Sequence, residues 1–356
     1  MHFAEGKVSL EYTRYIKRKS VFILGSISFL ILLLLLSISL GAVNIPLSDV
    51  VLTLLGKSIS KRFEIIIWNI RLPQAFSAIV AGAGLAVAGA VMQAILRNPL
   101  GSPFTLGISH AAGFGAAFSV MMLGSGVMSS AGIGTVTISN IYVTTIMAFL
   151  FSLIAAGIIV AVSKIRGASP ETMVLTGIAL ASLFTAGTML LQFFANDVQL
   201  AAMVFWTFGD VSRANWTELG VMAVIVIVSA VYLIAHSWNY NAIEAGDETA
   251  KGLGVRVDRV RLIGMLVSSL MTAVIVAFLG IIGFVGLVCP HMVRRLIGGD
   301  HRFLMPATLF AGSIVLLGSD TVARLILAPH LLPVSVLTAL IGAPMFIYLI
   351  LRGYRR

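Results

Sequence analysis

Few side chains in this 356-residue sequence could take part in chemistry. His110, in the stretch GISHAAG, is the one histidine that we expect beside a pathway within the apolar segments. An imidazole there is a candidate haem or metal ligand lining the pathway; the alternative is a hydrogen-bonded packing residue. The single cysteine, Cys289, lies in an apolar run and is predicted to be a small core residue.

The other histidines indicate no metal site. His291 and Arg294 lie one helical turn apart in CPHMVRR, which suits a structural role. His301 and His330 are expected in loops without partner carboxylates, so the ligand cluster that a metal requires does not form. The sequence therefore predicts neither a bound metal nor a disulfide.

The acidic residues argue against chemistry at membrane depth. An ion-coupled secondary transporter normally carries intramembrane carboxylates, whereas Glu171, Asp197, Glu218 and Asp320 are expected at the ends of apolar segments. The sequence has no HExxH or GxSxG arrangement of an intramembrane enzyme, and it has no nucleotide-binding P-loop. We therefore predict a protein that catalyses no covalent step and takes its energy from a partner.

The composition is that of a multi-pass membrane protein. Hydrophobic residues make up 59% of the chain and charged residues 11%, against roughly 25% charged in a soluble domain. The net charge of +10 is explained by basic residues in cytoplasmic loops, so no nucleic-acid partner is expected. We expect membrane lipid to surround the chain.

Ten apolar segments predict an all-α fold with about ten transmembrane helices. Their expected bounds are Val21–Val43, Leu72–Leu96, 104–123, 140–163, Glu171–Phe194, Glu218–His236, Arg261–Gly280, Gly283–Arg295, Phe303–Leu327 and Pro333–Leu351. Residues 1–20 and 353–356 are predicted to be cytoplasmic tails, and residues 21–352 the transmembrane domain. Small residues crowd the second segment, where they let helix backbones approach closely.

The distribution of basic residues sets the orientation. Only six of the 24 Lys and Arg residues fall on the side opposite the N-terminus, namely Lys57, Lys61, Arg62, Arg71, Arg213 and Arg324. This excess places both chain ends in the cytoplasm.

One polar stretch, Asn239–Arg261, divides the domain into halves of about 21–238 and 262–352. So many charges cannot lie in hydrocarbon, and the orientation places the stretch in the cytoplasm. Residues 247–251 suit a short helix, with Gly252 and Gly254 ending it. A compact helical connection of this kind is predicted to be a docking surface.

Five motifs in order resemble one family. They are RLPQ, GAVMQAILRNPLGSPFTLGIS from Gly89, GDETAKGLGV from Gly246, GFVGLVCPHMVRR from Gly283 and DTVARLILAPHLLPVSVLTALIGAPMF from Asp320. Their order and spacing, over roughly residues 20–352, resemble the FecCD family of ABC importer permeases for iron-siderophore, haem and cobalamin. The resemblance implies the type II importer fold, a homodimer, two cytoplasmic ABC ATPase subunits and an extracytoplasmic binding protein. ATP and Mg²⁺ would bind to the ATPase subunits, and this chain would hold no cofactor.

The resemblance also implies roles for individual residues. Residues of the polar stretch would couple the chain to the ATPase: Gly246, Asp247, Glu248, Ala250, Lys251, Leu253 and Gly254. Lys251 stands where the family commonly has Arg, and Gly252 is unusual within the short helix. Asn98, Leu100, Ser169 and Pro170 would form the cytoplasmic gate.

Arg71 and Arg324 occupy the positions that dock the binding protein in the family. The alternative for Arg324 is an intrahelical pair with Asp320, four residues earlier, and Arg71 could instead extend along the membrane edge. Gln74 replaces a second arginine of the cobalamin permease, which disfavours that subfamily. An iron complex is the expected substrate, with cobalamin, haem and molybdate as alternatives.

Overall fold

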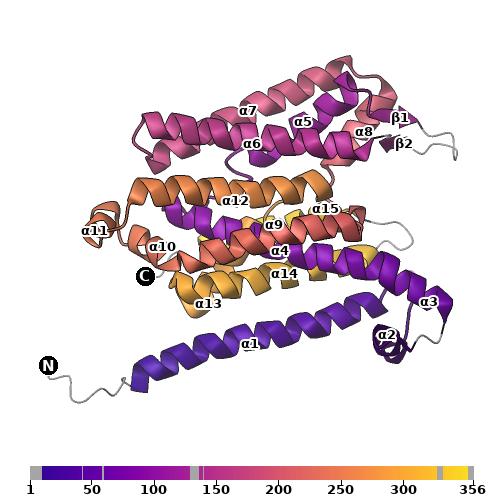
Figure 1. Ribbon diagram of the computed structural model, residues 1–356, viewed down its shortest axis with the longest axis horizontal. Helices are drawn as coiled ribbons and strands as arrows, with labels where there is room; N and C mark the ends of the chain where they lie inside the picture. Colours follow the sequence, from indigo (N-terminus) through magenta and orange to yellow (C-terminus); the bar gives the residue numbers. More distant parts are fainter. Residues whose placement is uncertain are drawn as a thin grey trace.

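The computed structural model describes residues 10–41, 43–57, 60–128, 136–138, 140–326 and 332–351. Nearly all of these residues are helical (Figure 1). The elements are α1 (Leu10–Ser39), α2 (Leu47–Leu54), α3 (Lys61–Ile65), π-helix η1 (Ile66–Arg71), α4 (Leu72–Ile95), α5 (Ile108–Met122), β1 (Gly126–Met128), β2 (Val136–Ile138), α6 (Ile141–Ile165), α7 (Pro170–Phe194), α8 (Asp197–Thr207), 3₁₀-helix η2 (Val211–Arg213), α9 (Trp216–Ala235), α10 (Ser237–Glu244), α11 (Asp247–Gly252), α12 (Val257–Leu279), α13 (Val285–Ile297), α14 (His301–Ile326) and α15 (Val334–Leu351).

Each of the ten predicted apolar segments folds as a helix, so the all-α class is confirmed. Within the described residues, seven helices are long and apolar enough to cross a membrane. The other three, α5, α13 and α15, have 15, 13 and 18 residues. The predicted connection at 124–140 contains a two-stranded antiparallel hairpin, β1 with β2.

The first helix begins earlier than predicted. It starts at Leu10, so part of the predicted tail at 1–20 is helical. The Lys19 ammonium, within the predicted tail, is buried and lies 3.9 Å from the ring centroid of Tyr15 and 4.9 Å from that of Phe303. Aromatic faces attract this cation, and the packing extends the helix toward the N-terminus. Residues 353–356 lie outside the described residues.

The helix α4 is the centre of the bundle. It packs against α9, α12, α13 and α14. In the continuous helical span from Lys61 to Ile95, 83% of the most apolar 18-residue stretch is buried. The closest approach is between α4 and α13, where a Cβ added at Gly89 would lie 1.7 Å from the carbonyl oxygen of Gly286. The small residues of this segment therefore set the distance between helices, as predicted.

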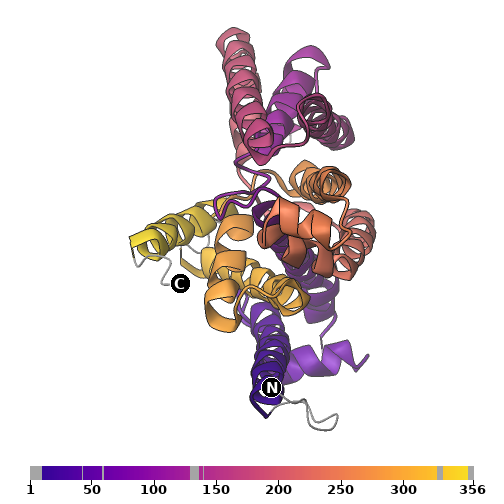
Figure 2. The same cartoon turned by 90° about the vertical axis from the view of Figure 1, so that its left-hand side faces the viewer.

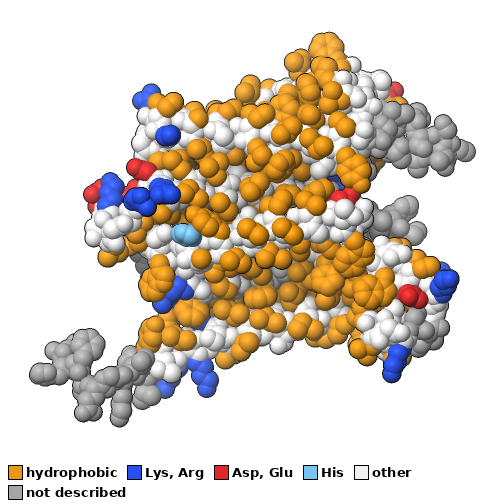
Figure 3. Space-filling view, viewed as in Figure 1, with side chains coloured by type: hydrophobic (Ala, Val, Ile, Leu, Met, Phe, Trp, Pro, Cys, Tyr) orange, Lys and Arg blue, Asp and Glu red, His pale blue; other side chains and the backbone are white. Residues whose placement is uncertain are grey.

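The surface of the molecule is an apolar band between two charged ends. Figure 3 shows hydrophobic side chains over the middle of the visible face, with acidic and basic side chains at its two ends. Large exposed apolar side chains include Leu175, Phe193 and Val224, with 67%, 80% and 63% of their surface exposed. Contiguous apolar surface of this extent fits hydrocarbon and not water, which confirms a multi-pass membrane protein.

Two ends of the bundle carry different elements. The start of α1 lies at the same end of the bundle as α10 and α11, whereas α2 and α3 lie at the other end (Figure 1). Figure 2, seen from the α11 end, shows α5, α6 and α7 as a group beside the central helices and α15 projecting on another side. The predicted cytoplasmic connection is therefore at the end where the chain enters its first helix.

A substitution tests the close helix contact. Gly89→Ala is expected to lower the stability of the protein by about 3 kcal/mol or more, because the new methyl group meets a backbone carbonyl that cannot turn away. Gly157→Ala in α6 is the control, since a Cβ there meets nothing within 4 Å. Thermal unfolding in detergent measures both, and equal melting temperatures would contradict the packing described.

Candidate functional site

The polar connection folds into two short helices, α10 and α11, at one end of the bundle (Figure 1). It has a small core of its own, formed by Ala242, Ile243, Ala250 and Val257, all buried. The predicted helix at 247–251 corresponds to α11, which runs from Asp247 to Gly252. The packed interior gives the connection a defined shape, which suits a docking element.

The outer surface of this connection carries the other predicted coupling residues. Lys251 Nζ lies 2.9 Å from Glu248 Oε1, and both side chains are exposed. The hydrogen bond that Lys251 donates to the Glu248 carboxylate raises the pKa of Lys251. Leu253 is 69% exposed, and Gly254 has φ +81°, which a side chain at Cβ would strain. Contact between these residues and an ATPase stays a prediction.

Arg261, in the first turns of α12, joins this connection to the rest of the bundle. Its side chain is buried, and its Nη2 lies 3.0 Å from Asp247 Oδ1 on α11. Its Nε donates a hydrogen bond to the carbonyl of Ile95 at the end of α4, at 2.7 Å, and its Nη1 donates one to the carbonyl of Ala168 before α7, at 3.0 Å. One planar guanidinium thus connects three segments that are far apart in the sequence.

Two of those segments lead into the predicted gate. Arg97 follows the end of α4 and precedes Asn98, and it has φ +46°. Ala168 precedes Ser169 and has φ +51°. Backbone in this region costs of order 1–3 kcal/mol for a residue with a side chain and is found where a surrounding structure holds it in place.

The gate residues themselves lie at two helix ends. Asn98 Oδ1 accepts a hydrogen bond from the Leu100 amide at 2.9 Å, and Leu100 is 46% exposed. Ser169 caps the start of α7 by accepting from the Thr172 amide at 3.2 Å, and Pro170 is the first residue of that helix. Through Arg261 the structure brings both gate segments to α11, although their gating role is untested.

A second set of contacts holds the other end of the connection. Glu244 Oε1, at the end of α10, lies 2.6 Å from Arg294 Nη1 on α13 and 3.2 Å from His301 Nε2 on α14. The sequence-based interpretation of His301 as a histidine without a partner carboxylate is wrong, because α10 folds back onto α14. Burial alone raises the pKa of Glu244, but the neighbouring His301 and Arg294 side chains outweigh it and lower the pKa.

The direction of this pKa shift sets the pH range over which Glu244 stabilises the fold. A carboxyl whose pKa is lowered by folding stabilises the fold above its ordinary pKa of 4.5 and loses that contribution as the pH falls through the lowered value. The ion pair of Glu244 with Arg294 is therefore complete at neutral pH.

Arg71 and Arg324 lie at the opposite end of the bundle, both against the end of α1. The Arg71 guanidinium is buried and donates hydrogen bonds to the carbonyls of Ile38, Ser39 and Val43. Arg324 Nη2 donates to Ser37 Oγ at 2.7 Å. Both side chains thus have partners within the chain, and docking by these arginines stays a prediction.

The predicted intrahelical pair is present as well. Arg324 Nε lies 3.0 Å from Asp320 Oδ2. Gln74 Nε2 donates a hydrogen bond to the other oxygen of Asp320 at 2.9 Å. The glutamine that replaces an arginine in RLPQ therefore satisfies a buried carboxylate between α4 and α14.

His110 lies in the first turn of α5. Its ring centroid is 5.1 Å from that of Phe104, and the side chain is half-buried. Among the described residues, no partner for its Nδ1 and no group of three metal-ligating side chains is found. Pathway lining by His110 stays a prediction.

The sequence did not single out Arg261 or Glu244 as functional residues. Both appeared only as boundary or loop residues of the polar stretch. A signal was available for Arg261, since it begins a long apolar segment where a cation is costly unless paired. Its partners Ile95 and Ala168 could not be read from sequence because they are backbone carbonyls.

The comparisons with known proteins decide the family. The FecCD transport family matches residues 29–352. The chain belongs to this family. The FecCD chain is 54% identical over 346 residues to a Methanocaldococcus jannaschii protein that carries the provisional name of an ABC transporter permease, covering 97% of this chain and 98% of that one.

Two further relatives have names that state a substrate. The Fe(3+)-citrate import system permease protein YfmE of Bacillus subtilis is 37% identical, covering 95% of this FecCD chain and 97% of the relative. The hemin transport system permease protein HmuU of Yersinia pestis is 36% identical, covering 90% and 94%.

A solved structure agrees with the fold. It is described as an inward-facing conformation of an ABC transporter provisionally assigned to the metal-chelate type, with TM-score 0.80, 29% identity and coverage of 93% of this chain and 99% of that chain. This FecCD protein is therefore a membrane permease subunit of an ABC transporter, a class that works with ATPase and binding-protein partners.

The Arg261 contacts can be tested through stability. Arg261→Gln is expected to lower the free energy of unfolding by about 3 kcal/mol, because it removes the buried guanidinium that donates to two buried carbonyls and leaves Asp247 with Arg97 as its remaining ion-pair partner. Arg295→Gln, at an exposed arginine of α13, is the control. Chemical denaturation in detergent measures both, and a loss no larger than that of the control would show that the connections are weak.

Proposed function

We propose that this chain is the permease of an importer for a ferric complex and that it works as a homodimer. Two cytoplasmic ABC ATPase subunits would bind ATP and Mg²⁺ and dock on α10 and α11. An extracytoplasmic binding protein would deliver the substrate near Arg71 and Arg324. The chain itself would hold no cofactor and catalyse no covalent step.

One observation carries the mechanism: the shared contacts of Arg261. Movement of α11 by an ATPase would act on Asp247, then on the Arg261 guanidinium, and from there on the ends of the segments that carry Asn98, Leu100, Ser169 and Pro170. The two contacts to the carbonyls are buried and the contact to Asp247 is partly buried, so a displacement of α11 would be passed on through the guanidinium. Coupling and gating would thus be parts of one movement.

The exposed position of Leu100 supports a gate between two copies of the chain. A single chain leaves this residue 46% exposed at the end of the bundle where α11 lies. A pathway between two protomers would place both copies of Leu100 on a shared axis, where apolar contact closes a pore.

The relatives favour an iron complex as the substrate. The Bacillus relative is named for ferric citrate, the Yersinia relative for hemin, and the solved structure for metal chelates. Haem or cobalamin import is the alternative, and His110 beside Phe104 is the residue that would favour haem.

The coupling role predicts a difference between two neighbouring glycines. Gly254→Val is expected to uncouple ATP hydrolysis from uptake by tenfold or more, because valine resists φ +81° and would change the path from α11 to α12. Gly252→Val is the control, since a Cβ there meets nothing within 4 Å and its φ is ordinary for a side chain. Uptake per ATP in vesicles measures the effect, and normal uptake by the Gly254 variant would refute the role.

The substrate prediction is tested with the chain co-expressed with its ATPase. ATPase activity of the reconstituted complex is expected to rise when the binding protein loaded with a ferric complex is added. Binding proteins loaded with haem or cobalamin are the controls. Stimulation by one of those alone would replace the iron assignment, and uptake that follows a proton or sodium gradient without an ATPase would overturn the importer proposal.

A further inference from the structure

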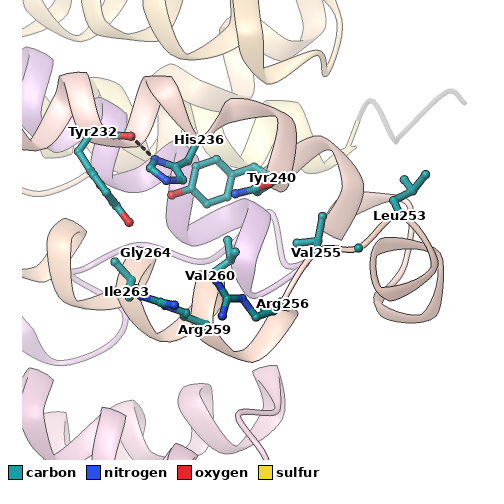
Figure 4. Close-up of a pocket in the computed structure, with 12 residues that line it drawn as sticks. Tyr232, His236, Tyr240, Leu253, Val255, Arg256, Arg259, Val260, Ile263 and Gly264 are labelled. Carbon is teal, nitrogen blue, oxygen red and sulfur yellow. Dashed lines mark hydrogen bonds between the residues drawn. The ribbon is translucent and has the colours of Figure 1, made fainter.

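A cavity of about 460 Å³ lies beside the polar connection, between the end of α9 with α10 on one wall and the start of α12 on the other. Figure 4 shows Tyr232, His236 and Tyr240 on the first wall and Arg256 and Arg259 on the second. The mechanism above uses none of these five side chains.

Two arginines of α12 and the segment before it line this cavity. Within the part of the chain that the structure describes, Arg256 and Arg259 are exposed and form no ion pair or hydrogen bond through their guanidinium groups. No side chain among the described residues caps the 23-residue helix α12, which starts between them at Val257 and carries one carboxylate, Asp258, in its first turn. Two free guanidinium groups beside the positive end of a helix dipole attract an anion, and phosphate fits their planar donors.

The facing wall supplies an imidazole and a phenolic hydroxyl as hydrogen-bonding groups. His236 Nδ1 lies 2.8 Å from the carbonyl oxygen of Tyr232. A carbonyl oxygen only accepts, so Nδ1 carries the proton and Nε2 is left as the ring's second polar atom. The Tyr240 side chain is nearly fully buried, and burial raises the pKa of its hydroxyl. That hydroxyl therefore stays a donor at all physiological pH values.

An apolar row leads away from the cavity along α9. Val224 and Val228 are 63% and 64% exposed, and they precede Tyr232 and His236 at four-residue spacing. Residues at this spacing lie on one face of a helix. Tyr232 and His236 line the cavity, so the exposed valines continue from the cavity wall along α9.

We propose that this cavity binds the phosphate headgroup of an anionic phospholipid from the cytoplasmic leaflet. Arg256 and Arg259 would hold the phosphate, the Tyr240 hydroxyl would donate a hydrogen bond to it, and the acyl chains would lie along the exposed valines of α9. A free phosphate would use the charged groups alone, whereas a lipid uses the apolar row as well. Basic pockets between helices on this side of a membrane suit anionic headgroups.

The site would also touch the coupling connection. Leu253, Gly254 and Val255 line the cavity together with Arg256. A headgroup bound there would hold the segment between α11 and α12 in place, so lipid composition would influence how firmly α11 is positioned.

The test is native mass spectrometry of the full chain in detergent, titrated with phosphatidylglycerol. The variant Arg256→Gln with Arg259→Gln is expected to bind this lipid about 30-fold more weakly. The matched control is Lys164→Gln with Arg166→Gln, which removes two exposed charges from another loop at the same end and should bind as the unaltered chain does. Phosphatidylcholine should bind far more weakly, and millimolar inorganic phosphate should not displace phosphatidylglycerol.

Several outcomes would overturn the proposal. Equal weakening in both double variants would show a general effect of surface charge. Displacement by inorganic phosphate would assign the cavity to the free anion. Loss of bound phosphatidylglycerol when the ATPase subunits are added, with the arginines protected, would assign the cavity to an acidic side chain of the ATPase.

Discussion

The buried guanidinium of Arg261 is the interaction on which the site depends. It donates to Ile95 and Ala168 and pairs with Asp247, so the end of α4, the start of α7 and the helix α11 share one group. A buried charge of this kind is tolerated only when all its hydrogen bonds are made. Moving the end of α4 or the segment before α7 alone would break a buried hydrogen bond, and moving α11 alone would break the partly buried pair with Asp247. We therefore expect the three segments to move together.

The bundle around this group is built to resist deformation. Residues of α4 with little or no side chain bring its backbone against α13 and α14, and the closest contact is backbone to backbone at Gly89. In hydrocarbon, such packing supplies much of the association energy, since lipid gives no hydrophobic drive between helices. A rigid α4 transmits displacement from its cytoplasmic end. At the other end of the bundle, Arg71, Gln74, Asp320 and Arg324 join α1, α4 and α14 by buried polar contacts.

Much of this architecture could be predicted from sequence. Ten apolar segments became ten helices because length and hydropathy decide membrane insertion, and the Asp320–Arg324 pair followed from four-residue spacing. The fold-back of α10 onto α14 could not be predicted, because Glu244 and His301 are far apart in the sequence and the pairing depends on tertiary contacts. The same holds for Arg261, whose partners include two backbone carbonyls. The start of α1 was missed because Lys19 resembles a free flanking charge until its aromatic partners are known.

The central claim is that α11 and the segment before α7 move as one unit through Arg261. Spin labels at Lys251 and Arg166, both exposed, would report this distance within one protomer of the complete transporter, and the single native cysteine is buried. The account predicts the same distance with and without ATP in the unaltered protein, and a changed or broadened distance when Asp247→Asn weakens the pair. A distance that shifts with ATP to the same extent in both proteins would contradict it.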